Sequence, residues 1–203
     1  MSDEPLSPDR LKIIANSDLK LEVVHALDTL MLEENLDHVS VKHICDTANI
    51  SRATFYRYFE DKFDIVQWYL EFLSTKGVDR IGRSLSWYEG YFISTALVHD
   101  NIQFFTNASK STDRHSLTHF APRRRRETME RTLVEYRGVE MTEHLRYQVE
   151  AVAVLETTMF PAWHTGHIVC SLEEACQWMV ECIPHELFEL LNTPLEPEKL
   201  RRR

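Results

Sequence analysis

The stretch V-K-H-I-C-D-T-A-N-I-S-R-A-T-F-Y-R-Y-F-E-D-K, residues 41–62, is the feature that most constrains how this chain folds. Ser40 precedes it and is a good N-cap for an amphipathic first helix. Asn49 follows that helix, and Asn is one of the few non-glycine residues that tolerate a left-handed conformation. Ser51 is a second N-cap and predicts a second helix over 52–59. The stretch therefore predicts two short helices joined by a tight turn.

The second of these helices has an apolar inner side and a polar, basic outer side. Phe55 and Phe59 lie four residues apart, so we expect both to point inward. Outward-facing Arg, Lys, Thr and Tyr side chains bind DNA phosphates, and an Arg at the helix start reaches base edges. An ordinary helical corner with solvated charges is the alternative, but aromatics alternating with Arg are a costly surface unless something binds them. The residues that we expect to contact DNA are Ser40, Lys42, Ser51, Arg52, Thr54, Tyr56, Tyr58 and Lys62.

The run S-R-A-T-F-Y-R-Y-F-E-D-K, residues 51–62, resembles the recognition helix of TetR-type (TetR/AcrR) transcriptional regulators. Their pattern there is Ser or Thr, then T-[FL]-Y, an aromatic or His, a Phe, and a Lys after two further residues. This chain has Asn49 where the family usually has Gly, and Tyr58 where it often has His. The resemblance covers roughly residues 18–69. Ile44, Ala48 and Ile50 match the preceding helix and turn.

The resemblance implies an all-α homodimer that binds a palindromic double-stranded DNA operator. It implies an N-terminal three-helix, helix-turn-helix DNA-binding head followed by a helical regulatory and dimerisation bundle. It also implies a repressor that leaves DNA when a small molecule enters the C-terminal domain. The helix after Lys62 is then the lever between the two parts. Alternatively, the C-terminal domain binds a protein partner instead of a small ligand.

Glycine and proline positions divide the chain into three parts. We expect a flexible leader over 1–17, because Pro5 and Pro8 disfavour early helix, apart from a short turn of helix over 10–15. The head with its linking helix then covers 18–80, and the helical ligand-binding and dimerisation domain covers 81–203. Helical periodicity predicts a first main helix from Asp18 to about Asn35 and further helices over 61–79, 85–108 (one bent or two short), 123–137, 142–164 and 171–191.

Composition limits the partners and the location. The net charge is -9, while residues 40–62 carry a net charge of +1, so nucleic-acid binding must come from a local patch. The cysteines form no CxxC pair, and reduced thiols in a cytoplasmic protein are the simplest interpretation. No apolar run approaches the length of a membrane span, and we expect no contact with membranes.

Two other clusters contain residue types that occur in binding sites. Arg123–Arg126 is interpreted as a solvated helix face balanced by glutamates at helical spacing, not as a second DNA contact. His164, His167 and Cys170 are metal-ligand types, but they straddle a helix end and lack an evident fourth ligand. We therefore predict no metal and no cofactor. Sequence motifs for catalysis are absent, which argues against an enzyme, although a helical metal-dependent enzyme remains a third alternative.

Aromatic residues gather in the C-terminal part and suggest where an effector binds. Most of them fill the core, yet buried Tyr and Trp need partners for their polar ends, which suits a pocket for a small apolar effector. The apolar stripes of the last two helices hold no Arg or Lys, so we do not expect a strongly anionic effector. For the dimer interface we expect Val152, Leu155, Met159 and Met179 at the centre. The residues predicted to border the pocket are Trp87, Tyr91, Phe105, Phe160 and Trp163.

Overall fold

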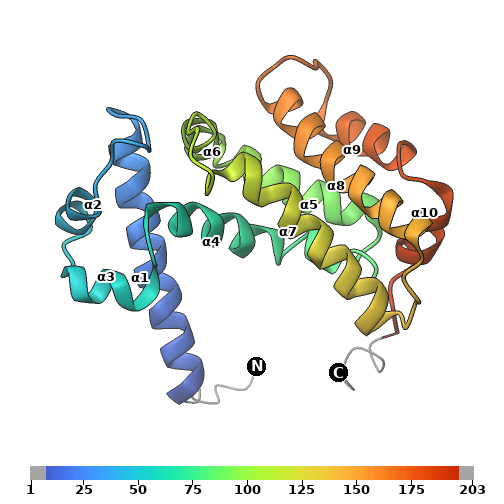
Figure 1. Ribbon diagram of the computed structural model, residues 1–203, viewed down its shortest axis with the longest axis horizontal. Coiled ribbons are helices and arrows are strands. Elements are labelled where there is room, and N and C mark those ends of the chain that lie inside the picture. The colour runs from blue at the N-terminus through green and yellow to red at the C-terminus, as the bar shows by residue number, and fades with distance from the viewer. Residues whose placement is uncertain (1–7, 197–203) are drawn as a thin grey trace, which may run out of the picture.

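The computed structural model describes residues 8–196, and side chains from Ser17 onward. These residues form helices, turns and an isolated bridge between Ile81 and Leu85, and no strand. The predicted all-α class is confirmed (Figure 1). In chain order the helices are α1 (Pro8–Met31), α2 (Val41–Thr47), α3 (Arg52–Tyr58), α4 (Lys62–Ser74), η1 (Val78–Arg80), α5 (Trp87–His99), α6 (Ile102–Ala108), α7 (Leu117–Arg131), η2 (Thr132–Tyr136), α8 (Glu143–His164), α9 (Leu172–Glu181) and α10 (His185–Asn192).

Helix α1 begins earlier than the sequence pattern suggests. It starts at Pro8, so the predicted start at Asp18 is wrong, and Asp18 lies inside the helix as an exposed residue. Proline fits the first position of a helix because its missing N–H would have no intrahelical partner there. Only residues 1–7 of the predicted leader lie outside the described part. In Figure 1 the first turns of α1 extend past α3 and away from the other helices.

The α2–turn–α3 unit has the N-caps that its sequence predicts. Ser40 Oγ accepts from His43 N at 3.1 Å, and Ser51 Oγ accepts from Thr54 N at 3.0 Å. Asn49 has φ 52°, the left-handed conformation that the tight turn requires. Phe55 and Phe59 are buried against α1 and α4, as predicted. Local hydrogen bonds therefore fix where each helix starts, and Asn49 fixes the turn between them.

Two hydrophobic cores lie along the molecule, and α4 connects them. The first core joins α1–α4 and also takes in Phe104, Phe105 and Ala108 of α6. The second joins α5 to η2 and α7–α10 around Trp87 and Tyr91. Figure 1 shows α4 running from the head towards the bundle, beneath α6 and α7. The first core thus extends from the N-terminal head into the C-terminal domain.

The C-terminal bundle follows the predicted helices with shifted ends. The segment 85–108 forms two helices, and α7 starts at Leu117 and not near Arg123. Ser171 and Glu174 form the predicted capping box at the start of α9. Gly138 and Gly166 both have positive φ, of 67° and 76°, at the helix ends where they were expected. The helix 142–164 is confirmed as α8, with Thr142 as its N-cap.

Candidate nucleic-acid interface

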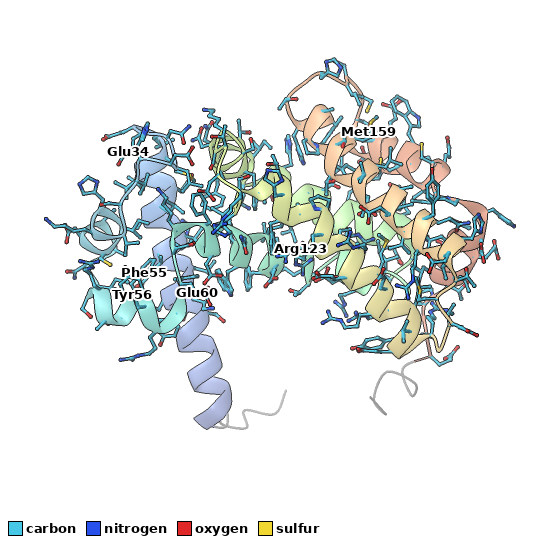
Figure 2. The ribbon with its side chains drawn as sticks, in the orientation of Figure 1. Glu34, Phe55, Tyr56, Glu60, Arg123 and Met159 are labelled. Carbon is cyan, nitrogen blue, oxygen red and sulfur yellow. The ribbon has the colours of Figure 1, made fainter. Side chains whose placement is uncertain are left out.

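The outer face of α3 presents an ordered aromatic and basic pair. Tyr56 is 52% exposed, and the Cζ atom of Arg52 lies 5.9 Å from the centre of its ring. The guanidinium of Arg52 also donates a hydrogen bond to the Tyr56 hydroxyl, and this bond raises the pKa of Arg52. Figure 2 shows Tyr56 on α3, at the end of the molecule far from the bundle. An arginine held in this way loses little side-chain entropy when it binds DNA, which favours recognition of a base edge or phosphate.

The remaining predicted DNA contacts differ in how free their side chains are. Lys42 is exposed, whereas the hydroxyls of Ser40 and Ser51 already cap α2 and α3. The Thr54 hydroxyl lies 2.9 Å from Ser51 Oγ, so it shares that cap. Tyr58 is half-buried against the first core, so the expectation that it lies on the outer arc holds only in part. Of the predicted DNA contacts, Lys42, Arg52 and Tyr56 therefore have exposed side chains that no helix cap uses.

Lys62 has a structural role that its position in the motif does not reveal. Its Nζ donates to Asp37 O at 2.6 Å and to Val39 O at 3.0 Å, so it holds the segment that leads into α2. Partial burial lowers the pKa of Lys62, while Asp37 opposes that shift. An ammonium has three donors, and two of them are used here. At most one donor of Lys62 is left for a phosphate.

The C-terminal domain contacts the same segment from the other side. Ser111 Oγ donates to Asp37 Oδ1, and Thr112 N donates to Asp37 Oδ2 at 3.4 Å. The hydrogen bond from Ser111 is the main cause of the lowered pKa of Asp37. Gln67 Nε2 of α4 donates to His115 O at 3.0 Å. The loop between α6 and α7 is therefore bonded both to α4 and to the segment that positions the reading helices.

Comparison with known proteins identifies this head. The model of the family "Bacterial regulatory proteins, tetR family" matches residues 23–67, which span the end of α1, α2, α3 and the start of α4. The head of this chain is therefore similar to the DNA-binding heads of the tetR family. A helix-turn-helix transcriptional regulator of Bacillus subtilis (strain 168), YxbF, is 37% identical over 46 residues. That match covers 23% of this chain and 12% of the relative, so it concerns the head alone.

Solved structures share the fold beyond the head. The dihydroxyacetone kinase operon activator DhaS is similar with a TM-score of 0.57 at 16% identity, over 86% of this chain and 98% of that one. A protein described as a TetR-family transcriptional regulator from Syntrophomonas wolfei strain Goettingen is also similar with a TM-score of 0.57 at 16% identity, over 87% of this chain and 98% of its own. At this identity the likeness shows the fold alone: a helix-turn-helix head followed by a helical bundle.

The residues predicted to border an effector pocket separate into three places. Trp87, Tyr91 and Phe160 come together in the second core, with ring centres 5.6 Å apart for the first two and 5.3 Å for the last two. Phe105 belongs to the first core and stacks on Tyr69 at 5.6 Å. Trp163 lies at the end of α8, with its ring centre 5.3 Å from that of His99. Only the first three can line a common site.

Two surface depressions accompany this packing. One, of about 310 Å³, is lined by charged residues of α7, η2 and α8 together with Val134 and Met141. The other, of about 340 Å³, lies between α1 and the end of α2. None of the five predicted pocket residues lines either depression. The place where Trp87 and Tyr91 meet is instead filled by charged side chains.

These charged side chains correct the interpretation of Arg123–Arg126 as a solvated face. Arg123 is exposed (Figure 2), but Arg125 is buried and donates from Nε to Glu156 Oε2 at 2.6 Å. Arg124 donates to both carboxylate oxygens of Asp79, at 3.0 and 2.5 Å, and its Nε lies 3.4 Å from Glu71 Oε1. Sequence spacing paired these arginines with glutamates of their own helix, whereas the fold brings acids from other helices closer.

The candidate metal ligands at the end of α8 do not converge. The ring of His164 stacks on that of His99 with centres 5.6 Å apart, and Trp163 Nε1 donates to Cys170 O at 2.9 Å. His167 is exposed. Among the described side chains, residues 17–196, no three His, Cys, Asp or Glu side chains gather to hold a metal ion. In the same part of the chain no helix has the length and apolar character needed to cross a membrane.

Proposed function

We propose that this chain is a cytoplasmic, DNA-binding transcriptional regulator that reads a palindromic operator as a homodimer. The observation that supports this most is the preformed α2–turn–α3 unit, whose caps and left-handed Asn49 hold Arg52 and Tyr56 outward. A two-fold dimer presents two such units to two half-sites, about one helical turn of DNA apart. The local basic patch then attracts DNA, although the protein as a whole has a negative net charge.

We further propose that the regulator is a repressor that a small molecule releases from DNA. Its basis is the family likeness of the head together with the contacts between the loop after α6 and the segment around Asp37. A ligand that favours a different position of the bundle relative to α4 changes the spacing of the two heads. Exposed apolar residues on α8 and α9, such as Val154 and Trp178, support the dimer, or else the alternative of a protein partner on this surface.

The test is selection of DNA from a random pool, followed by gel-shift titrations across salt concentrations. Arg52→Ala is expected to relax base preference at one position in each half-site, at a cost of about 1–3 kcal/mol. Tyr56→Ala is expected to weaken binding to all sequences. Arg123→Ala is the matched control, because it removes an exposed charge outside the head. Selection of no sequence, or equal losses in all three variants, would refute the assignment.

A further inference from the structure

The bundle buries an ion pair where its core would otherwise be apolar. Arg125 of α7 is 6% exposed and Glu156 of α8 is 5% exposed. The guanidinium donates from Nε to Oε2 at 2.6 Å and from Nη2 to Oε1 at 3.1 Å, and Tyr91 Oη of α5 donates to the same Oε1 at 2.7 Å. Three donors on two helices thus converge on one carboxylate, with the fork geometry by which arginine recognises carboxylates.

The same place holds a donor that lacks an acceptor. Trp87 is fully buried, and its Nε1 has no hydrogen-bond partner among the described residues. The centre of its ring lies 5.6 Å from that of Tyr91 and 5.8 Å from the Cζ atom of Arg125. A buried N–H without an acceptor is costly, so its position beside a carboxylate-binding group indicates that a further oxygen belongs there.

We propose that Arg125, Tyr91 and Trp87 form a binding site for the carboxylate of an effector with an apolar body, and that this carboxylate replaces that of Glu156. This inference rests on the proposed function, because it names the chemical class of the effector. Replacement is required because two buried carboxylates on one guanidinium leave a negative charge unpaired. Phe160 is half-buried one turn of α8 from Glu156, and its ring meets that of Tyr91, so it supplies an apolar wall towards the surface.

The replacement has a direct route to the DNA-binding head. Release of Glu156 breaks a buried ion pair between α7 and α8. The adjacent residue on α7 is Arg124, which is bonded to Asp79 of η1 and lies near Glu71 of α4. A shift of α7 therefore pulls on the C-terminal end of α4 and on η1, which follows it. The proposal departs from the expectation that a strongly anionic effector is unlikely, which considered only the last two helices, because Arg125 lies on α7.

The test is carboxylate rescue of Glu156→Ala, followed by thermal melting without DNA. Loss of the carboxylate leaves Arg125 buried and unpaired, which is expected to lower the melting temperature by about 10 °C. Acetate at tenfold its Kd is expected to restore about 3–6 °C. Affinity should rise about fourfold for each added methylene from acetate to hexanoate, because the longer chain buries apolar surface. Glu156→Gln, which keeps the shape, is measured in parallel in case Glu156→Ala does not fold.

The controls are acetamide, sodium chloride at equal ionic strength, and the double variant in which Arg125→Met is added to Glu156→Ala. We expect none of them to show rescue. We expect Trp87→Phe to reduce the affinity for acetate about fivefold or more, since it removes the N–H donor together with part of the indole ring. Rescue by acetamide equal to that by acetate, rescue that survives Arg125→Met, or no rescue in either Glu156 variant would overturn the proposal. Melting is measured without DNA, so a failure of the DNA-binding proposal would not change this result. A failure of the carboxylate proposal would likewise not change the DNA-binding result.

Discussion

Tyr69 Oη of α4 donates a 2.7 Å hydrogen bond to Asn101 Oδ1, the residue before α6. The ring of Tyr69 also stacks on Phe105, and burial is the main cause of its raised pKa. This side chain therefore belongs to the DNA-binding head and to the C-terminal domain at once. It is the most direct polar link between the helix that supports the head and the junction of α5 with α6.

Tyr69→Phe is expected to remove this link while the ring packing is kept. Asn101 Oδ1 then loses its donor inside a partly buried junction, which costs about 1–2 kcal/mol of unfolding free energy. Thermal melting and DNA affinity are measured together, with Tyr88→Phe as control because the Tyr88 ring stacks on Phe92 within the bundle. An unchanged melting temperature for Tyr69→Phe would show that the hydrogen bond contributes nothing net.

Lys62→Met is expected to destabilise the head by about 1.5–3 kcal/mol, because it removes charge-assisted hydrogen bonds to two carbonyl groups. The carbonyls of Asp37 and Val39 lose these donors, and the entry to α2 loosens. Denaturant unfolding checks the stability, and gel shifts check the affinity. Lys42→Met serves as the control, since Lys42 is an exposed lysine on α2. If Lys62→Met lowered DNA affinity with unchanged stability, its role would be phosphate contact alone.

Trp178→Glu and Val154→Glu are expected to convert a dimer to monomers. Both residues are large, apolar and exposed, at 47% and 49%, on α9 and α8. Burying a carboxylate without a partner in an interface is costly. Val152 and Met179, expected at the interface centre, are instead buried within one chain, while Met159 is exposed (Figure 2). Sedimentation at micromolar concentration decides, and a wild-type monomer would refute this prediction.

Stability is expected to fall as the pH drops from about 6.5 towards 4, in part because of His164. Burial, and then the neighbouring His99, lower the pKa of His164 to about 4. Between these values the unfolded chain binds a proton that the folded chain does not, so unfolding becomes more favourable as pH falls. His164→Gln should reduce the drop in melting temperature by about 2–4 °C. His167→Gln, at an exposed site, should leave it unchanged, and equal effects of both would contradict the assignment.

The sequence by itself determined the features that depend on neighbours a few residues away. Ser40 and Ser51 cap the two short helices, Asn49 makes the turn, and Phe55 and Phe59 face inward, all as their spacing indicated. Such features follow from backbone hydrogen bonds within one turn and from the helical repeat. The recognition motif could be found in the sequence for the same reason: its residues are contiguous.

Tertiary structure alone decided which distant residues meet. Lys62 bonds to carbonyls of the segment before α2, Phe105 joins the core of the head, and Arg125 pairs with Glu156 of another helix. A helical pattern tells which face of a helix is buried, but the partner of that face depends on how the helices cross. Ion pairs also form with whichever acid the fold brings nearest. For that reason the helical periodicity of the C-terminal domain does not predict the buried ion pair between Arg125 and Glu156.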